Sequence, residues 1–273
     1  MKLADERHLT FIHPFDDLDV ATGQGTIAME IVQELPTVDY ILVPVGGGGL
    51  VTGVSTLAKM LNPKIKVIGV EPKNAASMTE ALKNDGPVTL PSANTIADGT
   101  AVKRVGTKIF PYCKENIAQM LTVDDSRLIG AFLNMVENHK MIVENSGLLP
   151  VAALDQLDLK GKKAVLVLSG GNMDVITMSS VVQHGLIQQD RIFTVSVLLP
   201  DKAGELVKVA AAIADQNGNV IKLEHNQFVS INRNASVELR ITMESYGTNH
   251  KQQILKALEE KGYQPKVVDT KLY

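Results

Sequence analysis

The segment Val43-Pro44-Val45-Gly46-Gly47-Gly48-Gly49-Leu50 decides how the first part of this chain folds. It continues the apolar run that starts at Tyr40 and precedes a helix-like segment from Val51 to Leu61. Four consecutive glycines remove every Cβ from the turn, so its backbone can adopt positive φ angles and approach a ligand closely. Unpaired amides at the start of a helix lie at the positive end of its dipole, which suits a phosphate. The strand–loop–helix context therefore predicts an anion-binding loop, with a flexible turn as the alternative.

Length and composition are those of an ordinary globular protein. The 273 residues suffice for about two domains, and 45% are hydrophobic and 21% charged, with a mean hydropathy of +0.07. The 27 basic and 30 acidic residues are mixed along the chain, so we expect no nucleic-acid partner. Cys113 is the single cysteine, which excludes an internal disulfide framework. Because we find no export signal and no apolar run of roughly 18–20 residues, we expect a cytoplasmic protein without a membrane partner.

Strands and helices alternate through the first two thirds of the chain. Apolar runs without period-two alternation are typical of a parallel sheet that helices cover on both faces, so we predict an α/β fold. We also expect a short strand over residues 11–15 and one helix over residues 19–35. The apolar runs lie near residues 40–45, 66–70, 121–123 and 164–168.

The end of the chain has a different pattern. Val237, Leu239, Ile241 and Met243 alternate with polar residues, which is typical of a half-exposed strand. Helical and extended segments from Arg191 onward follow the order strand–helix–strand–strand–helix–strand. This order predicts a small α+β, ferredoxin-like module with an antiparallel sheet, joined to the first part near residues 184–191.

Two glycine patterns need to be distinguished. Gly23-Gln24-Gly25-Thr26-Ile27-Ala28 matches the dinucleotide pattern G-x-G-x-x-A, but it does not follow a strand directly and lacks the acidic residue expected about twenty positions later. The tetraglycine segment has no Gly-Lys-Ser/Thr, so it does not match a nucleoside-triphosphate loop. A phosphate monoester therefore fits the tetraglycine segment better than a nucleotide.

A second candidate binding group follows the last strand of the α/β part. Ser169 stands in Leu168-Ser169-Gly170-Gly171-Asn172, where a strand end in an open sheet can contact a ligand ring. The alternative is a turn in which the serine caps a helix. A phosphate site and a neutral hydrogen-bonding group together suggest pyridoxal phosphate.

Six motifs in this order resemble the threonine ammonia-lyases (threonine/serine dehydratases), which are fold-type-II, tryptophan-synthase-like pyridoxal-phosphate enzymes. The resemblance extends through about residue 186, and the tail resembles the ACT regulatory domain of some family members. It implies an enzyme domain over residues 1–186 and an ACT-like domain over residues 191–273. The motifs are Pro14-Phe15-Asp16-Asp17, Gly23-Gln24-Gly25-Thr26, Val45-Gly46-Gly47-Gly48-Gly49-Leu50, Gly69-Val70-Glu71-Pro72, Ala97-Asp98-Gly99 and Leu168-Ser169-Gly170-Gly171-Asn172.

The resemblance implies the site and the reaction. Ser169 would meet the pyridine nitrogen of the cofactor, and Glu144 would lie in the cofactor pocket, although Asn145 replaces a proline common in the family. The implied reaction is β-elimination of threonine (and serine) to 2-oxobutanoate and ammonia, in isoleucine biosynthesis or threonine catabolism. The residues implied to hold the cofactor are Gly46, Gly47, Gly48, Gly49, Leu50, Gly99, Glu144 and Ser169.

One part of the family's machinery has no counterpart in this sequence. The family's Schiff-base lysine lies in a Ser-x-Lys-x-Arg motif upstream of Pro14-Phe15-Asp16-Asp17, and no lysine here has that context. The chain resembles a family member without its first third. We therefore expect no catalytic residue in this chain and no turnover of threonine by this polypeptide alone.

The resemblance also suggests two further sites. Glu71, the carbonyl of Ala75 and Ser77 correspond to a cation site of some relatives, and serine in place of a carboxylate disfavours a divalent ion but not a monovalent one. Asp201 and Gly204 lie in the turn where ACT domains bind an amino acid, usually across a dimer interface. We therefore expect a branched-chain amino-acid effector and a homo-oligomer, with a plain strand–helix turn as the alternative.

Two other functions stay open. In one, the α/β part is vestigial and the chain is a non-catalytic amino-acid sensor that uses only its ACT-like module. In the other, the chain is a serine dehydratase or serine racemase relative. A lysine motif upstream in the reading frame would separate the enzyme from the sensor, and assays with threonine and serine would separate the two enzymes.

Overall fold

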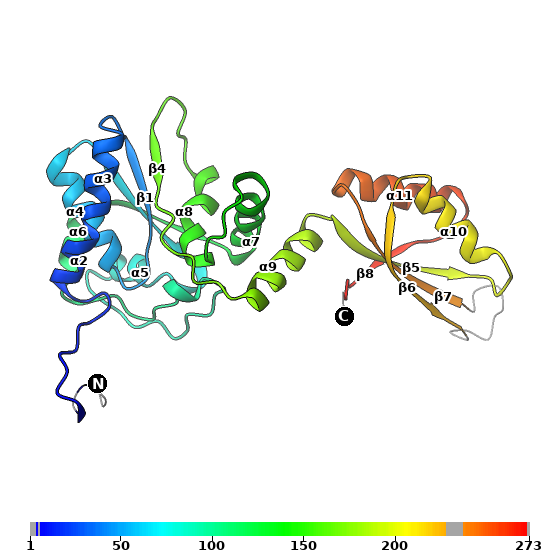
Figure 1. The fold of residues 1–273 in the computed structure, drawn as a ribbon, viewed down its shortest axis with the longest axis horizontal. Helices are drawn as coiled ribbons and strands as arrows, with labels where there is room; N and C mark the ends of the chain where they lie inside the picture. The colour runs from blue at the N-terminus through cyan, green and yellow to red at the C-terminus, as the bar shows by residue number, and fades with distance from the viewer. Residues whose placement is uncertain (1–3, 5, 228–236, 272–273) are drawn as a thin grey trace. The chain divides into compact units, whose positions relative to one another are not determined.

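The computed structural model describes residue 4, residues 6–227 and residues 237–271. The chain divides into two compact units, Met1–Met178 and Ser179–Tyr273 (Figure 1). Among the described residues, no helix is both long and apolar enough to cross a membrane.

The first unit is built on a four-stranded parallel sheet, as the apolar runs predict. The strands lie in the order β3-β2-β1-β4, and every neighbouring pair is parallel. Side chains of β1 are buried on both sides of the sheet, because Ile41, Leu42 and Val43 are all 0% exposed. The strands are β1 (Tyr40–Pro44), β2 (Lys66–Pro72), β3 (Ile117–Val123) and β4 (Ala164–Leu166).

Helices cover both faces of this sheet, which confirms the predicted α/β arrangement (Figure 1). The helices α4 (Gly49–Leu61) and α8 (Leu149–Ala152) both contact β1 and β2, from opposite sides. Helices α2, α3 and α6 pack on α4, and α7 packs on α8. The other helices of this unit are α2 (Leu18–Gln24), α3 (Thr26–Glu34), α5 (Ser77–Lys83), α6 (Phe110–Asn116) and α7 (Asp125–Asn134), with short turns η1 (Lys73–Ala75), η2 (Asp98–Thr100), η3 (Met135–His139), η4 (Asn145–Leu148) and η5 (Leu154–Gln156). The division between the two units falls within α9 (Val175–Gln188).

Two predicted elements are wrong. Residues 11–15 form no strand, and the segment instead turns around His13. The His13 Nδ1 atom accepts hydrogen bonds from the amides of Phe15 (3.3 Å) and Asp16 (2.9 Å). The single helix expected over residues 19–35 is two helices, α2 and α3, which meet at Gly25.

The break at Gly25 lies where α2 and α3 pack against α4. A Cβ added to Gly53 in α4 would lie 2.0 Å from the Ala21 carbonyl oxygen and 2.7 Å from the Gly25 nitrogen. The two backbones therefore touch without side chains between them. Gly25 of the G-x-G-x-x-A pattern thus serves helix packing, since it follows a helix and not a strand.

The second unit has the predicted element order. Its four strands form an antiparallel sheet in the order β6-β7-β5-β8, with α10 and α11 packed on the same core. Val195, Leu239 and Ile241 of the sheet pack with Ile213 and Ile254 of the helices in that core. The elements are β5 (Ile192–Leu199), α10 (Glu205–Ala214), β6 (Asn219–Asn226), β7 (Val237–Glu244), α11 (Thr248–Glu260) and β8 (Lys266–Val268).

The contact at Gly53 predicts a large difference between two glycine-to-alanine variants. Gly53→Ala should lower the free energy of unfolding by at least about 2 kcal/mol, because the backbone of α2 would have to move away. Gly130→Ala in α7 is the matched control, since its Cβ would meet nothing within 4 Å. Alanine at that helical position should stabilise by about 0.5–1 kcal/mol. Urea denaturation measures both changes, and equal stability of the two variants would contradict the packing.

Candidate functional site

A cavity of about 560 Å³ lies at the carboxyl ends of β1 and β4. This is the edge of an open parallel sheet at which ligands bind. The structure brings together at this cavity all eight residues predicted to hold a cofactor. They are Gly46, Gly47, Gly48, Gly49, Leu50, Gly99, Glu144 and Ser169.

The tetraglycine segment forms the turn between β1 and α4. Gly48 has φ +103°, so the predicted positive φ is confirmed at this residue. A Cβ on Gly47 would lie 2.1 Å from the Phe15 ring, and one on Gly49 would lie 2.9 Å from the Phe15 carbonyl oxygen. The turn is therefore closed on its outer side by Phe15, and only a chain without side chains fits there.

The amides of this turn are available to a ligand. None of the amides of residues 46–51 donates a hydrogen bond to another described residue. The carbonyl oxygens on the same turn are held, since Gly47 accepts from the Gly106 amide at 3.0 Å and Gly48 accepts from the Thr52 hydroxyl at 2.8 Å. The turn thus presents amides at the positive end of the α4 dipole, an arrangement that binds phosphate.

Glu144 and Ser169 lie at the end of β4 that borders the cavity. The Glu144 amide donates to the Gly170 carbonyl oxygen at 3.0 Å, and its carboxylate accepts from the Asn172 amide at 3.2 Å. Glu144 therefore holds the segment that carries Ser169. Gly99 faces the Glu144 carboxylate, because a Cβ on Gly99 would lie 3.3 Å from Glu144 Oε1.

Ser146 is a site residue that the sequence motifs did not identify. Its side chain lines the cavity and is 2% exposed, and its Oγ atom has no hydrogen-bond partner among the described residues. A buried hydroxyl without a partner costs free energy, so it is typical of a group that meets a ligand. The only sequence signal was its place two residues after Glu144, within Glu144-Asn145-Ser146-Gly147.

These residues fit pyridoxal phosphate. The available amides suit its phosphate, and hydroxyls of Ser146 and Ser169 suit polar atoms on a ring. Among the described residues, no lysine lines the cavity.

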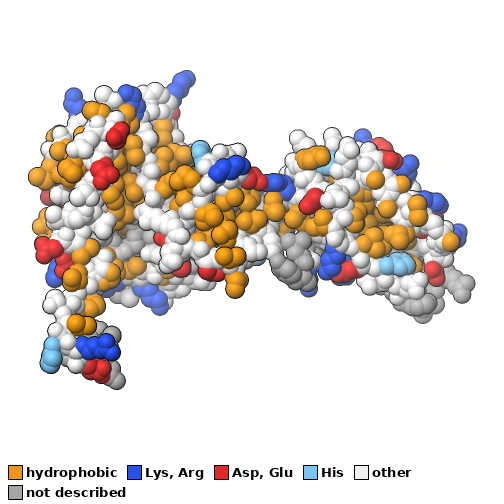
Figure 2. Space-filling model, in the orientation of Figure 1, with side chains coloured by type: hydrophobic (Ala, Val, Ile, Leu, Met, Phe, Trp, Pro, Cys, Tyr) orange, Lys and Arg blue, Asp and Glu red, His pale blue; other side chains and the backbone are white. Residues whose placement is uncertain are grey.

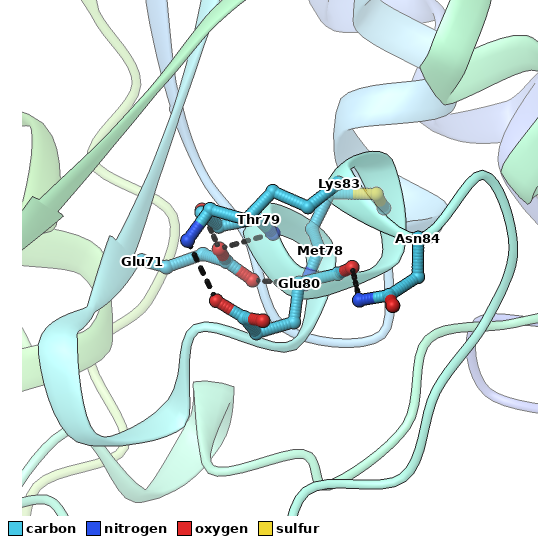
Figure 3. A network of polar contacts seen from close by, with 6 residues as sticks. All are labelled: Glu71, Met78, Thr79, Glu80, Lys83 and Asn84. Carbon is cyan, nitrogen blue, oxygen red and sulfur yellow. Dashed lines mark hydrogen bonds and ion pairs between the residues drawn. The ribbon is translucent and has the colours of Figure 1, made fainter.

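The predicted cation residues are buried and do not line this cavity, and Figure 3 shows the hydrogen bonds made by one of them, Glu71. Glu71 is 0% exposed, and its carboxylate accepts hydrogen bonds from the Met78 amide (2.6 Å), the Thr79 amide (2.9 Å) and the Thr79 hydroxyl (2.7 Å). Burial raises the pKa of Glu71 to about 7, against the opposing effect of these hydrogen bonds. Ser77 directly precedes Met78, and its buried Oγ atom has no hydrogen-bond partner among the described residues. Ala75 is buried as well. The carboxylate therefore binds the first turn of α5, and a cation at Glu71, Ala75 and Ser77 stays a prediction.

The predicted effector residues lie in the second unit. Gly204 has φ +90° and precedes α10, and Asp201 lies exposed three residues earlier in the same turn. A Cβ on Gly204 would meet nothing within 4 Å, so its positive φ, and not crowding, favours glycine there.

The unpartnered hydroxyl of Ser146 generates a prediction about stability. Ser146→Ala should leave the free energy of unfolding unchanged or raise it by up to about 1 kcal/mol, because the hydroxyl makes no hydrogen bond to the described chain. Thr52→Val is the matched control, since it removes a buried hydroxyl that does donate to Gly48, and it should destabilise by about 1 kcal/mol. Added pyridoxal phosphate should raise the unfolding midpoint of the parent chain more than that of Ser146→Ala. If Ser146→Ala and Thr52→Val lowered the free energy of unfolding equally, the Ser146 hydroxyl would have a hydrogen-bond partner in the protein.

Comparison with known proteins agrees with the motifs. A family model described as "Pyridoxal-phosphate dependent enzyme" matches residues 1–170. An L-threonine ammonia-lyase of Thermotoga maritima is 35% identical over 98% of this chain and 67% of its own length. The processed form of threonine deaminase isoform 2 from Solanum lycopersicum shares 37% identity with a TM-score of 0.63, over 67% of this chain and 54% of its own. Maize serine racemase shares 32% identity with a TM-score of 0.62, over 69% of this chain and 59% of its own.

The chain thus spans between 54% and 67% of the length of these three proteins. The family model covers more than half of the chain, and the first relative aligns with nearly all of it. Both findings confirm the family and the cofactor that the six motifs predict. The chain belongs to the family of pyridoxal-phosphate dependent enzymes.

Proposed function

We propose that the protein carrying this chain is an ammonia-lyase that converts threonine, and serine as a second substrate, to the corresponding 2-oxo acid and ammonia. The observation that supports it is the meeting of eight motif residues around one cavity at the strand ends. Two of the similar proteins are named for this activity, an L-threonine ammonia-lyase and a threonine deaminase.

Each binding group would have a distinct task. Bound pyridoxal phosphate supplies a ring that withdraws electrons from the substrate Cα. The amides of Gly46 through Gly49 would hold the phosphate, and Ser169 would form a hydrogen bond with the ring nitrogen. A serine hydroxyl is neutral, so it leaves that nitrogen largely unprotonated, whereas a carboxylate would keep it cationic. The weaker electron withdrawal favours loss of the β-hydroxyl over transamination.

The net reaction is balanced without another reactant. The atoms of threonine are those of 2-oxobutanoic acid and ammonia, so the protein needs no oxidant or reductant. We propose a place in amino-acid metabolism, either isoleucine biosynthesis or threonine catabolism, and a cytoplasmic location.

Two alternatives differ from this proposal in measurable ways. A serine dehydratase or serine racemase relative is supported by the similarity to maize serine racemase. It would prefer serine, and a racemase would release D-serine. A non-catalytic sensor would bind an amino acid in its second unit and release no ammonia from either substrate.

The role of Ser169 predicts the effect of a single substitution. In the complete gene product, Ser169→Ala should lower kcat/KM for threonine by about tenfold, the value of one hydrogen bond of about 1.4 kcal/mol. Ser92→Ala, at another exposed serine of the same unit, should leave it unchanged. Ammonia and 2-oxobutanoate release from threonine and from serine measures both. A Ser169→Ala enzyme as active as the parent would contradict the assignment, and a preference for serine would favour the alternative enzyme.

We further propose that the second unit is an ACT domain that binds a branched-chain amino acid at the turn containing Asp201 and Gly204. Its support is the element order strand–helix–strand–strand–helix–strand and the positive φ of Gly204 at the start of α10. The turn lies at a helix N-terminus, where amides can bind a carboxylate.

Titration calorimetry with isoleucine and valine tests this second proposal. The 273-residue chain should bind one of them, and Asp201→Ala should weaken binding by about tenfold through loss of a charged contact to the ligand's ammonium group. Asp215→Ala is the control, because it changes an exposed aspartate at the opposite end of α10. No heat with either amino acid would count against the effector.

A further inference from the structure

The cavity of the first unit offers no cationic side chain to a phosphate. In the part of the chain that the structure describes, no Lys, Arg or His side chain lines it. On the face of the first unit drawn in Figure 2, Lys and Arg side chains are scattered among Asp and Glu side chains and form no patch. A phosphate in this cavity would therefore be held by backbone amides and hydroxyls, so its affinity depends on how well the amides are aimed.

The carbonyl oxygen of Gly48 accepts two hydrogen bonds from one residue. The Thr52 amide donates to it at 3.0 Å, and the Thr52 hydroxyl donates to it at 2.8 Å. The amide bond belongs to the regular pattern of α4, whereas the hydroxyl bond is an addition that serine and threonine can make in a helix. Because two donors meet one oxygen, the peptide group between Gly48 and Gly49 is held more firmly than one bond would hold it.

The fixed carbonyl determines where the Gly49 amide points. The bond between Gly48 and Gly49 is trans, so the oxygen and the N–H of this peptide group point in opposite directions. The oxygen points along α4 toward Thr52, and the Gly49 N–H therefore points out of the helix start, where the cavity lies. This amide donates to no other described residue, so it can meet a phosphate.

A buried thiol holds the Thr52 hydroxyl in this orientation. The Sγ atom of Cys113 in α6 lies 3.0 Å from Thr52 Oγ1, and both side chains are buried. Thr52 donates its single hydroxyl hydrogen to Gly48, so the thiol is the donor in this second contact. Burial raises the pKa of Cys113 to about 12, and the thiol therefore keeps its hydrogen. The three groups form a chain of hydrogen bonds in which each bond strengthens the next.

Apolar side chains enclose the same part of the turn. A Cβ on Gly48 would lie 2.5 Å from Ile109 Cδ1 and 2.9 Å from Met78 Cε, and both of these residues are fully buried. In such surroundings a hydrogen bond is stronger than in water. An apolar side chain of the same shape at position 52 would leave the Gly48 carbonyl with only the amide bond of the helix.

We propose that Thr52 is a positioning residue for the phosphate of the cofactor. Its hydroxyl aims the Gly49 amide into the cavity and polarises the peptide group that carries this amide, which makes the amide a stronger donor. Thr52 acts through Gly48 and Gly49, since it does not line the cavity itself. The inference rests on the proposed function, in which the amides of Gly46 through Gly49 hold the phosphate.

Two ligands that differ only in the phosphate test this role in the 273-residue chain. Pyridoxine 5′-phosphate and pyridoxine are suitable because neither has an aldehyde that reacts with lysines. In equilibrium dialysis the parent chain should bind the ester at least about tenfold more tightly than pyridoxine. Thr52→Val keeps the shape of the side chain and should weaken binding of the ester by about fivefold, the effect of one hydrogen bond. Its affinity for pyridoxine should stay within about twofold of the parent's.

Two further variants separate positioning from a general effect on the fold. Thr52→Ser restores the hydroxyl and should bind the ester within about twofold of the parent. Thr56→Val, one turn further along α4, removes a hydroxyl that accepts from Asn116 Nδ2 of α6 at 3.0 Å. It perturbs the same pair of helices without touching the turn, so both affinities should stay unchanged. Urea denaturation verifies that each variant is folded, and Thr52→Ala takes the place of Thr52→Val if the valine variant does not fold.

The outcomes distinguish this inference from the proposed function. A Thr52→Val chain that keeps the parent's preference for the ester overturns the role of Thr52 and leaves the phosphate site at the tetraglycine turn standing. An equal loss in Thr56→Val, or no recovery in Thr52→Ser, also overturns it, because packing would then be the cause. A parent chain that binds the ester no better than pyridoxine overturns both the role of Thr52 and the phosphate site.

Discussion

The first unit depends on direct contact between backbones at α4. Three glycines of this region, Gly47, Gly49 and Gly53, face the segment Phe15–Gly25 at distances that leave no room for a Cβ atom. The segment can therefore lie along α4 and fix its first turn against the sheet. Any side chain at these positions would push the segment away, and the amides of the tetraglycine turn would lose their position.

The two aspartates that follow Phe15 fix this segment through hydrogen bonds with backbone amides. Asp16 accepts a hydrogen bond from the Lys108 amide at 2.7 Å, and Asp17 caps α2 by accepting from the amides of Asp19 (2.9 Å) and Val20 (3.2 Å). The Phe15 ring, which follows Pro14 and precedes the two aspartates in the sequence, closes the tetraglycine turn. Thus the motif Pro14-Phe15-Asp16-Asp17 shapes the site without presenting a charge to the cavity.

Much of this site could be predicted from the sequence because parallel strands end at one edge. Gly46 and Ser169 are more than a hundred positions apart, and yet each lies shortly after the end of a strand of the same sheet, β1 ending at Pro44 and β4 at Leu166, so the sheet brings them to one cavity. Ser146 could not be predicted in this way, since what distinguishes it is a buried hydroxyl without a hydrogen-bond partner in the described part of the chain, and that depends on packing of the whole unit. The strand expected at residues 11–15 was wrong for a related reason, because the His13 side chain accepts hydrogen bonds from the amides of Phe15 and Asp16 and the chain turns there. Local pattern predicts which segments can be strands, and the contacts of the folded chain decide which are.

The second unit gives the clearest case of a feature that local pattern hides. In a regular strand, Val220 and Leu223 would point to opposite faces, because side chains alternate with a period of two. The β-bulge between Val220 and Lys222 adds one residue, and both side chains then lie opposite buried residues of β7, Met243 and Ile241. The bulge therefore places Val220 and Leu223 on the same side of the sheet, facing the core, although they are three positions apart in the sequence. Lys222 and Glu224, two positions apart and beyond the bulge, share the other side by simple alternation.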